Sequence, residues 1–502
     1  MTINLLKNDA VGKFLRSEWY PALPQALTAW VFLIVTWQLL AGGSDARRNM
    51  GSIFTWVLWW PMLPLIFLAT GRFWCAVCPF GFLSDLVQKA AGRRRPVPKF
   101  MRTYGIWFID VMFVLITWAD HVFGIFDSPL LTGAFMLTIV AGVVISGSIW
   151  QRRSWCRYLC FLGGLAGNYA RNGMVELRAT PEICAACRSK AACYNGTEIV
   201  SPCPIFEFAR TVDTSANCTL CGNCVKSCPN GAIEIRLRPP SSEIIAARSP
   251  KFEEAFLAIV IMGIVLVKNA SDTVPWGALL QRVESATHTG PTLAFTLIFI
   301  AALSIPGLAL ALMSRGAEAL NGDGWKSNFT RFGYALIPLD MASILAHTCV
   351  DLLSQGAAIV YAVLALAGIE SGAASRGIAD NSVISAMQIG LIAGGAAASL
   401  HAVYRIAGFH FGARGRALRT IVPYGAMISS FAAGNVYLFS LPKVVEAATS
   451  GISYVAKDFS PTLYAAVIVG SLIAVARATA WARTKHRVAR PKTKVTAGAA
   501  PG

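Results

Sequence analysis

Ten apolar segments of roughly membrane-spanning length constrain this chain more than any other feature. They lie at residues 24–41, 52–70, 104–119, 130–150, 254–268, 292–313, 334–366, 383–404, 420–441 and 461–482. A spanning helix needs about 20 mostly apolar residues to cross a hydrocarbon core of ~30 Å. Only 14% of the residues are charged, whereas soluble domains carry about 25%. The sequence therefore predicts an all-α polytopic membrane protein with ten transmembrane helices.

The Lys and Arg residues are unevenly distributed over the loops between these segments. If the N-terminus is cytoplasmic and the segments alternate, 37 of the 44 basic residues fall on the cytoplasmic side. Cytoplasmic loops of membrane proteins carry such an excess. We therefore expect a multi-pass protein of the bacterial cytoplasmic (inner) membrane with both termini inside the cell. Topology and lipid contact then explain the net charge of +18, and no nucleic-acid partner is expected.

One large polar insertion divides the chain into four parts. Residues 1–150 form an N-terminal membrane domain with four spans, and residues 151–253 form a cytoplasmic domain. Residues 254–482 form a C-terminal membrane domain with about six spans by their length. Residues 483–502 form a basic tail that we expect to be disordered.

Twelve of the 13 cysteines lie between Cys75 and Cys228, at spacings typical of metal ligands rather than of a disulfide framework. The run CTLCGNCVKSCP, which begins at Cys218, has the C-x2-C-x2-C-x3-C-P spacing of bacterial ferredoxins. A looser copy upstream also ends in Cys-Pro. Its cysteines are Cys184, Cys187, Cys193 and Cys203.

In two-cluster ferredoxins the cysteine before Pro ligates the cluster of the other run. This exchange predicts two [4Fe–4S] clusters on the cytoplasmic side. The ligands of the first are Cys203, Cys218, Cys221 and Cys224. The ligands of the second are Cys184, Cys187, Cys193 and Cys228. Zinc is the alternative, but zinc sites use two separated pairs of ligands rather than one continuous run.

Two further cysteine pairs follow the second and fourth apolar segments, each with a Trp before its first cysteine. They are Cys75 and Cys78 in WCAVCPFG, and Cys156 and Cys160 in WCRYLCFLGG. The topology puts all four at the cytoplasmic face, where a permanent disulfide is disfavoured. A metal site, a redox-active dithiol and a structural turn are the candidate roles.

Residues 70–235 resemble the membrane-bound polyferredoxins that serve periplasmic nitrate reductase and nitrous-oxide reductase (the NapH and NosR types). Those proteins combine cytoplasmic Cys-Pro motifs after two membrane helices with a two-cluster ferredoxin insertion, and the order here is the same. The family has Pro after the second short pair, whereas this chain has Phe161 after Cys160. The resemblance implies iron–sulfur electron transfer at the membrane and says little about residues 254–502.

Few ionisable residues lie in the apolar segments of the second half. Asp340, His347 and Asp351 are separated by seven and four residues, which places them on one helical face. Ionisable groups inside a membrane usually line a proton or ligand path or pair within the bundle. We expect this stripe to line a site for a quinone or its protons, and a purely structural Asp–His pair is the alternative. Haem is not expected, because no CxxCH motif occurs and His347 and His401 differ in depth.

The motifs together predict a membrane-integral protein that passes electrons between the quinone pool or a cytoplasmic donor and a partner redox enzyme. The insertion carries 13 Lys and Arg against 8 Asp and Glu, so an acidic ferredoxin or flavodoxin is a candidate donor. A periplasmic reductase system is another candidate partner. We expect an electron-transfer component rather than a stand-alone catalyst. The alternatives are an assembly or regulatory factor, which reduces a metal or thiol of a partner enzyme through the short cysteine pairs, and a redox-sensing transporter.

Overall fold

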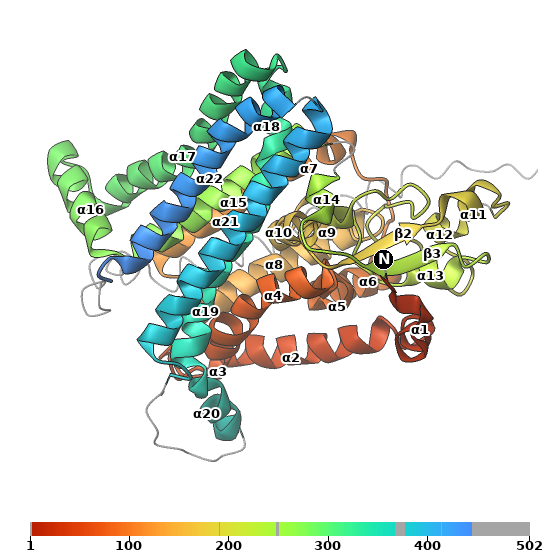
Figure 1. The fold of residues 1–502 in the computed structure, drawn as a ribbon. Coiled ribbons are helices and arrows are strands. Elements are labelled where there is room, and N and C mark those ends of the chain that lie inside the picture. The colour runs from red at the N-terminus through yellow and green to blue at the C-terminus, as the bar shows by residue number, and fades with distance from the viewer. Residues whose placement is uncertain (1–2, 190, 247–249, 367–376, 413, 444–502) are drawn as a thin grey trace, which may run out of the picture.

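The computed structural model describes residues 3–443, except for residues 190, 247–249, 367–376 and 413. Most of this part of the chain is helical (Figure 1). Eight of its helical stretches are long and apolar enough to cross a membrane. The mostly helical membrane architecture predicted from the sequence is thus confirmed. These stretches are Ala22–Ala41, Met50–Thr70, Lys99–Phe123, Pro129–Ile149, Phe252–Ser271, Pro291–Asn321, Trp325–Gln355 and Asn381–Phe411.

The first half of the chain supplies the helices around the cysteines. They are α1 (Asp9–Arg16), α2 (Ala22–Ala41), α3 (Met50–Ser52), the π-helix η2 (Ile53–Trp59), α4 (Trp60–Thr70), α5 (Trp74–Val77), α6 (Pro79–Ala91), α7 (Lys99–Phe123), α8 (Pro129–Ile149), α9 (Ser154–Tyr158) and α10 (Phe161–Ala170). The insertion adds α11 (Pro181–Ala185), α12 (Ala192–Asn195), the 3-10 helix η3 (Ser215–Asn217), α13 (Asn223–Ser227) and α14 (Ser242–Ile245). A further 3-10 turn, η1 (Leu5–Lys7), precedes α1.

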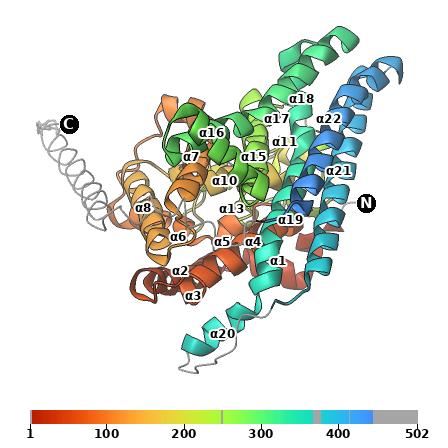
Figure 2. The ribbon, with the colours of Figure 1, turned by 90° about the vertical axis from the view of Figure 1, so that its left-hand side faces the viewer.

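The second half of the chain forms longer helices. They are α15 (Phe252–Ser271), α16 (Val274–Thr287), α17 (Pro291–Asn321), α18 (Trp325–Gly333), η4 (Tyr334–Leu336), α19 (Ile337–Gln355), α20 (Ala357–Leu366), α21 (Asn381–Phe411) and α22 (Arg414–Ser440). The view in Figure 2 shows α17, α19, α21 and α22 as one group beside α15. The main apolar core joins residues of α4, α7 and α10 to residues of α15, α19 and α21.

The seventh apolar segment differs from its prediction. We expected one continuous helix over 334–366, but α19 ends at Gln355 and α20 begins at Ala357. The Leu353 carbonyl accepts backbone hydrogen bonds from Ile378 and Ala379 instead of continuing the helical ladder. The spanning stretch instead starts earlier, at Trp325. Segment 420–441 corresponds to the second part of α22, which ends at Ser440 and is not one of the eight spanning stretches. Segment 461–482 and the tail 483–502 lie outside the described residues.

The insertion is built on a small antiparallel sheet in the order β1-β3-β2. Its strands are β1 (Ile3–Asn4), β2 (Val175–Ala179) and β3 (Ile233–Leu237), with Val175 opposite Leu237 and Ala179 opposite Ile233. The first residues of the chain thus pack on the insertion rather than among the membrane helices. Tyr20 is fully buried there and donates a hydrogen bond of 2.6 Å to the Leu220 carbonyl.

Candidate iron–sulfur sites

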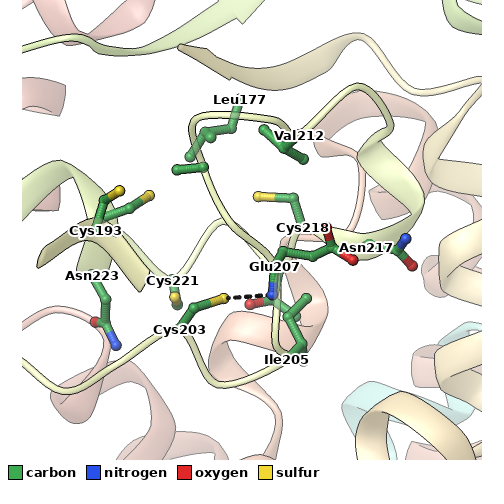
Figure 3. Close-up of a pocket in the computed structure, with 14 residues that line it drawn as sticks. Leu177, Cys193, Cys203, Ile205, Glu207, Val212, Asn217, Cys218, Cys221 and Asn223 are labelled. Atoms are coloured by element: carbon green, nitrogen blue, oxygen red, sulfur yellow. Dashed lines mark hydrogen bonds between the residues drawn. The ribbon is translucent and has the colours of Figure 1, made fainter. Parts of the chain in front are cut away.

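Two cavities in the insertion are lined by the eight ferredoxin-type cysteines. The first cavity is lined by Cys203, Cys218, Cys221 and Cys224, and Figure 3 shows the sulfur atoms of the first three around the same space. The second cavity is lined by Cys184, Cys187, Cys193 and Cys228. Cys193 also lines the first cavity, so the two cavities are adjacent. The fold therefore gathers the same two sets that the exchange rule selects, while the ligand assignment itself stays a prediction.

The two Cys-Pro steps have the same local geometry. Cys203 Sγ accepts a hydrogen bond of 3.4 Å from the backbone N–H of Glu207, drawn as a dashed line in Figure 3. Cys228 Sγ accepts one of 3.3 Å from the backbone N–H of Ala232. In both cases the donor lies four residues after the cysteine, as expected for two copies of one motif.

The third cysteine of each run lies in the first turn of a short helix. Cys193 belongs to α12 and Cys224 to α13. The residue before each helix has a left-handed backbone, with φ of 54° at Ala191 and 77° at Gly222. Gly adopts this conformation readily and Ala does so at a cost. The looser upstream run therefore reproduces the local backbone of the regular run despite its longer spacing.

Burial makes two thiols of the first ferredoxin cavity, Cys203 and Cys218, poor acids. It raises the pKa of Cys203 to about 11 and that of Cys218 to about 12. The thiolate is the metal-binding form of cysteine. Apolar side chains of Leu177, Ile205 and Val212 complete the first cavity. A cluster with positively charged iron fits this environment, because iron supplies the charge that the apolar wall lacks and would be held by the four thiolates.

The four cysteines of the short pairs also lie around one cavity, which we call the membrane chamber. It is lined by Cys75, Cys78, Cys156 and Cys160, with walls of aromatic side chains. Five of these aromatic side chains are the indoles of Trp56, Trp59, Trp60, Trp74 and Trp155. Within the described residues, no three His, Cys, Asp or Glu side chains converge on a site for a single metal ion. The four cysteines therefore lie close together, as expected if both pairs are at one face of the membrane. Which side of the membrane this is stays a prediction.

The second cysteine of each short pair is the N-cap of a helix. Cys78 precedes α6, which starts with Pro79, and Cys160 precedes α10, which starts with Phe161. The first helical residue has no intrahelical partner for its N–H, which is why Pro suits it. Phe161 therefore occupies the position that Pro occupies in the related family without changing the cap. Cys160 Sγ accepts a hydrogen bond of 3.3 Å from the Gly163 N–H.

Two buried arginines connect the membrane chamber to the insertion. Arg72 donates from Nε to Cys75 Sγ (3.4 Å), from Nη2 to the Cys156 carbonyl (3.2 Å), and from Nη1 to the Ala216 carbonyl. Burial by itself would lower the pKa of Arg72, but the cysteine sulfurs beside it, Cys75 first, raise the pKa above its usual value.

Arg153 forms the second connection. Its side chain pairs with Asp85 (2.6 Å) and donates to the Cys75 carbonyl (3.2 Å). Its backbone N–H donates to the Pro204 carbonyl (2.9 Å), next to Cys203. Sequence reasoning missed both arginines, although a shared R-x-W-C pattern at residues 72–75 and 153–156 was visible.

The polar stripe of α19 is divided between two environments. Asp340 is fully buried, and its Oδ2 accepts a hydrogen bond of 3.1 Å from the Tyr169 hydroxyl of α10. His347 and Asp351 are half-buried and lie within electrostatic range of Asp272, at the end of α15. Asp340 and His347 are about 10 Å apart along the helix at 1.5 Å per residue. The quinone or proton role of the stripe stays a prediction.

Family comparisons agree with the iron–sulfur class. One model described as a 4Fe–4S binding domain matches residues 52–98 and 132–173. A second model with the same description matches residues 214–234. The first model covers both short cysteine pairs, and the second covers the regular ferredoxin run. No solved structure matches the chain significantly.

Two relatives are similar to part of the chain. YccM of Escherichia coli, a protein named for electron transport, is 27% identical over 175 residues, which are 30% of this chain and 47% of YccM. An uncharacterized protein of Methanocaldococcus jannaschii is 27% identical over 194 residues, which are 37% of this chain and 71% of that protein. The chain thus spans about half the length of YccM. Together with the eight apolar helices, these matches identify the chain as a membrane-type protein that contains 4Fe–4S binding domains of the ferredoxin kind.

Proposed function

We propose that this protein carries single electrons between a cytoplasmic donor and the membrane through two [4Fe–4S] clusters held by its insertion. The observation that carries the proposal is the pair of adjacent four-cysteine cavities with Cys193 in the wall of both. When bound, such clusters supply one-electron chemistry at a potential that their surroundings set. In this proposal the cysteines bind the clusters, and the apolar side chains around the first cavity exclude water from it. The contacts of the insertion with the membrane domain hold the first cavity in place.

The electron donor that best fits the insertion is an acidic protein such as a ferredoxin or flavodoxin. The second cavity lies at the exposed side of the insertion, where Arg210 lines it and Arg188 follows Cys187. Both arginines are exposed. Complementary charge mainly accelerates the encounter of two proteins. The electron acceptor in this proposal is a quinone in the bilayer or a partner redox enzyme.

The proposed sidedness follows from the same arrangement. The insertion, the short cysteine pairs and the N-terminal strand β1 all lie in one part of the structure, whereas α16 lies at the opposite end (Figure 1). The basic residues favour the cytoplasm for the cysteine-containing end and for both termini. Clusters held on that side would be directly accessible to electron donors in the cytoplasm.

Electron entry can be tested with purified protein in vesicles that contain a quinone. Reduced flavodoxin should bleach the cluster absorbance, and electrons should then reach the quinone. The double variant Arg188→Glu/Arg210→Glu should slow the first step about tenfold or more at low salt and much less at high salt. Arg282→Glu, on exposed α16 at the far end, is the matched control and should react like the wild type.

A protein whose clusters react with dithionite but with neither flavodoxin nor quinol would contradict the electron-transfer proposal.

An assembly or regulatory factor is the second candidate, and the shared chamber of the two short cysteine pairs favours it. That role predicts reduction of a partner's metal or thiol, which stops in Cys75→Ser while flavodoxin still reduces both insertion clusters at the normal rate.

A further inference from the structure

One face of α7 is apolar and exposed over its first turns. Its side chains follow helical spacing and are 38% to 59% exposed: Phe100, Tyr104, Phe108, Val111 and Leu115. The opposite face packs inward, since Met101 is buried and a Cβ at Gly105 would lie 2.9 Å from Tyr158 of α9. Helix α7 belongs to one of the eight stretches that can cross a membrane. The exposed face, which we call the α7 stripe, therefore faces the acyl chains of the bilayer.

A strongly basic loop ends where the α7 stripe begins. The connection from α6 to α7 reads GRRRPVPK over residues 92–99, and no Asp or Glu occurs between Asp85 and Asp110. Four basic side chains of this loop and of the first turn of α7 are exposed: Arg94, Arg95, Lys99 and Arg102. None of the four forms an ion pair with another described residue. Their positive charge thus lacks a carboxylate partner within the described part of the chain.

The backbone of the basic loop is fixed by the neighbouring helix α8. The Arg95 N–H donates to the Ile149 carbonyl (3.0 Å) at the end of α8, and the Arg95 carbonyl accepts from the Gln151 N–H (2.9 Å). Val97 is 4% exposed and anchors the loop in the interior. The basic side chains therefore start from a backbone that is already ordered. A preorganised surface loses less conformational freedom when it binds a ligand.

The basic loop and the α7 stripe together specify the chemistry of a ligand. A guanidinium group binds phosphate through parallel N–H donors, so the loop favours a phosphate. A soluble phosphate would leave the apolar stripe unused, and an acidic protein could not reach a stripe that lies among acyl chains. An anionic phospholipid uses both surfaces, because basic clusters beside a membrane helix attract its headgroup. Tyr104 also suits this position, since Tyr is enriched where the membrane meets water.

We infer that the basic loop and the α7 stripe bind one anionic phospholipid. Its phosphate would lie beside Arg94, Arg95 and Lys99, and its acyl chains would follow the α7 stripe. The rings of Phe100 and Phe108, whose centroids are 5.5 Å apart, form the first part of that contact. This site lies beyond the proposed electron transfer and does not depend on it. The lipid would stabilise α7 where it packs on α9.

Lipid binding to the purified full-length protein tests the inference. Delipidated protein in detergent is titrated with phosphatidylglycerol or phosphatidylcholine, and native mass spectrometry counts the bound molecules. The wild type should bind one phosphatidylglycerol in preference to phosphatidylcholine. Arg94→Gln/Arg95→Gln should bind it roughly thirtyfold more weakly. Lys13→Gln/Arg16→Gln is the matched control and should bind like the wild type, because it removes the same charge from exposed residues of the eight-residue helix α1.

A second variant tests the acyl-chain contact without changing any charge. Phe100→Ala/Phe108→Ala should weaken the binding of phosphatidylglycerol severalfold, because both rings are exposed to the chains. Bound phosphatidylglycerol should also raise the thermal midpoint of the wild type more than that of either α7-site variant.

Four results would overturn the inference. Equal losses in Arg94→Gln/Arg95→Gln and in Lys13→Gln/Arg16→Gln would indicate a general attraction between charges. Binding of glycerophosphoglycerol, the headgroup without chains, as tightly as phosphatidylglycerol would indicate a site for soluble phosphate. Wild-type affinity in Phe100→Ala/Phe108→Ala would exclude the α7 stripe. Unchanged lipid binding together with slower reduction by flavodoxin in Arg94→Gln/Arg95→Gln would assign the basic loop to an acidic protein instead.

Discussion

Loss of Glu243 should weaken the support of the first ferredoxin cavity. Its carboxylate accepts from the Ser215 N–H (2.9 Å) and the Thr214 hydroxyl (2.7 Å), just before Cys218. It also pairs with Arg238 (2.5 Å) and Arg178 (3.0 Å). The side chain is 6% exposed. Glu243 thus connects the loop that leads into the regular cysteine run to strand β2, through Arg178, and to the residue that follows strand β3, Arg238.

The pKa of Glu243 gives the size of the effect. Burial alone would raise this pKa, but Arg238, Arg171 and Arg178 lower it from 4.5 to about 2. At about 1.4 kcal/mol per pKa unit, the ionised carboxylate contributes roughly 3 kcal/mol to folding. Removing one partner of a buried ion pair costs about 3–5 kcal/mol, which agrees. The contribution is complete above pH about 4.5, where the unfolded group is ionised, and disappears as the pH falls toward 2.

Glu243→Gln should therefore lower the thermal stability of the insertion. For a cooperative unit of roughly 100 residues, 3 kcal/mol corresponds to a midpoint about 10 °C lower or more. The loss of cluster absorbance on heating at pH 7 measures it. Glu234→Gln is the matched control, because the one ion pair that Glu234 forms with the described residues is with Arg236, and both of these side chains are about 30% exposed. Its expected effect is within about 0.5 kcal/mol.

The pH dependence separates this mechanism from a general loss of packing. The difference in midpoint between the wild type and Glu243→Gln should shrink as the pH is lowered from 5 to 3, since the wild-type carboxylate progressively loses its advantage. The midpoints in this pH series are read from tryptophan fluorescence rather than from cluster absorbance, because acid releases the sulfide of iron–sulfur clusters from both proteins. Equal losses for Glu243→Gln and Glu234→Gln at pH 7, or a difference that does not change with pH, would refute the reasoning.

Three other outcomes follow from the sites. Cys203→Ser should alter the paramagnetic signal of the cluster assigned to Cys218 rather than that assigned to Cys184, and the reverse result would refute the crossed ligand sets. His347→Gln should slow cluster reduction by quinol without changing iron content; a normal rate with a lower thermal midpoint would make the α19 stripe structural. A tag at Ile199, which is 89% exposed, should be accessible to an impermeant reagent only from the cytoplasmic side, and labelling from the outside would reverse the topology.

The missed residues around the membrane chamber show where sequence reasoning stopped. The Trp before the first cysteine of each short pair was visible in the sequence and was used, but the arginine two residues before that Trp was not, although the pattern R-x-W-C occurs in both, at residues 72–75 and 153–156. Each copy supplies one thiol and one indole to the same chamber, and this indole has no hydrogen-bond partner among the described residues. Each copy also places a buried arginine in contact with Cys75, and a second cysteine of the chamber follows each copy. A pattern of four residues recurs easily by chance. The position of both copies at one chamber, which only the structure shows, indicates that this repeat is meaningful.

The polar stripe of α19 shows the opposite limit. Helical periodicity correctly places Asp340, His347 and Asp351 along one face, because 3.6 residues complete a turn. Periodicity does not reveal which neighbours that face meets. Tyr169 of α10 is 171 residues from Asp340 along the chain, and Asp272 at the end of α15 is 75 residues from His347.

The sequence by itself determined the local chemistry of this protein. Apolar length set the spanning helices, and cysteine spacing set the cluster type, because both are properties of short continuous segments. The tertiary structure decided which distant segments meet. Strand β1 joins the insertion across more than 230 residues, from Ile3 to Leu237. Two cysteine pairs separated by two membrane helices close one chamber, with Arg72 between that chamber and the insertion. Such contacts depend on how helices pack, which no local pattern encodes.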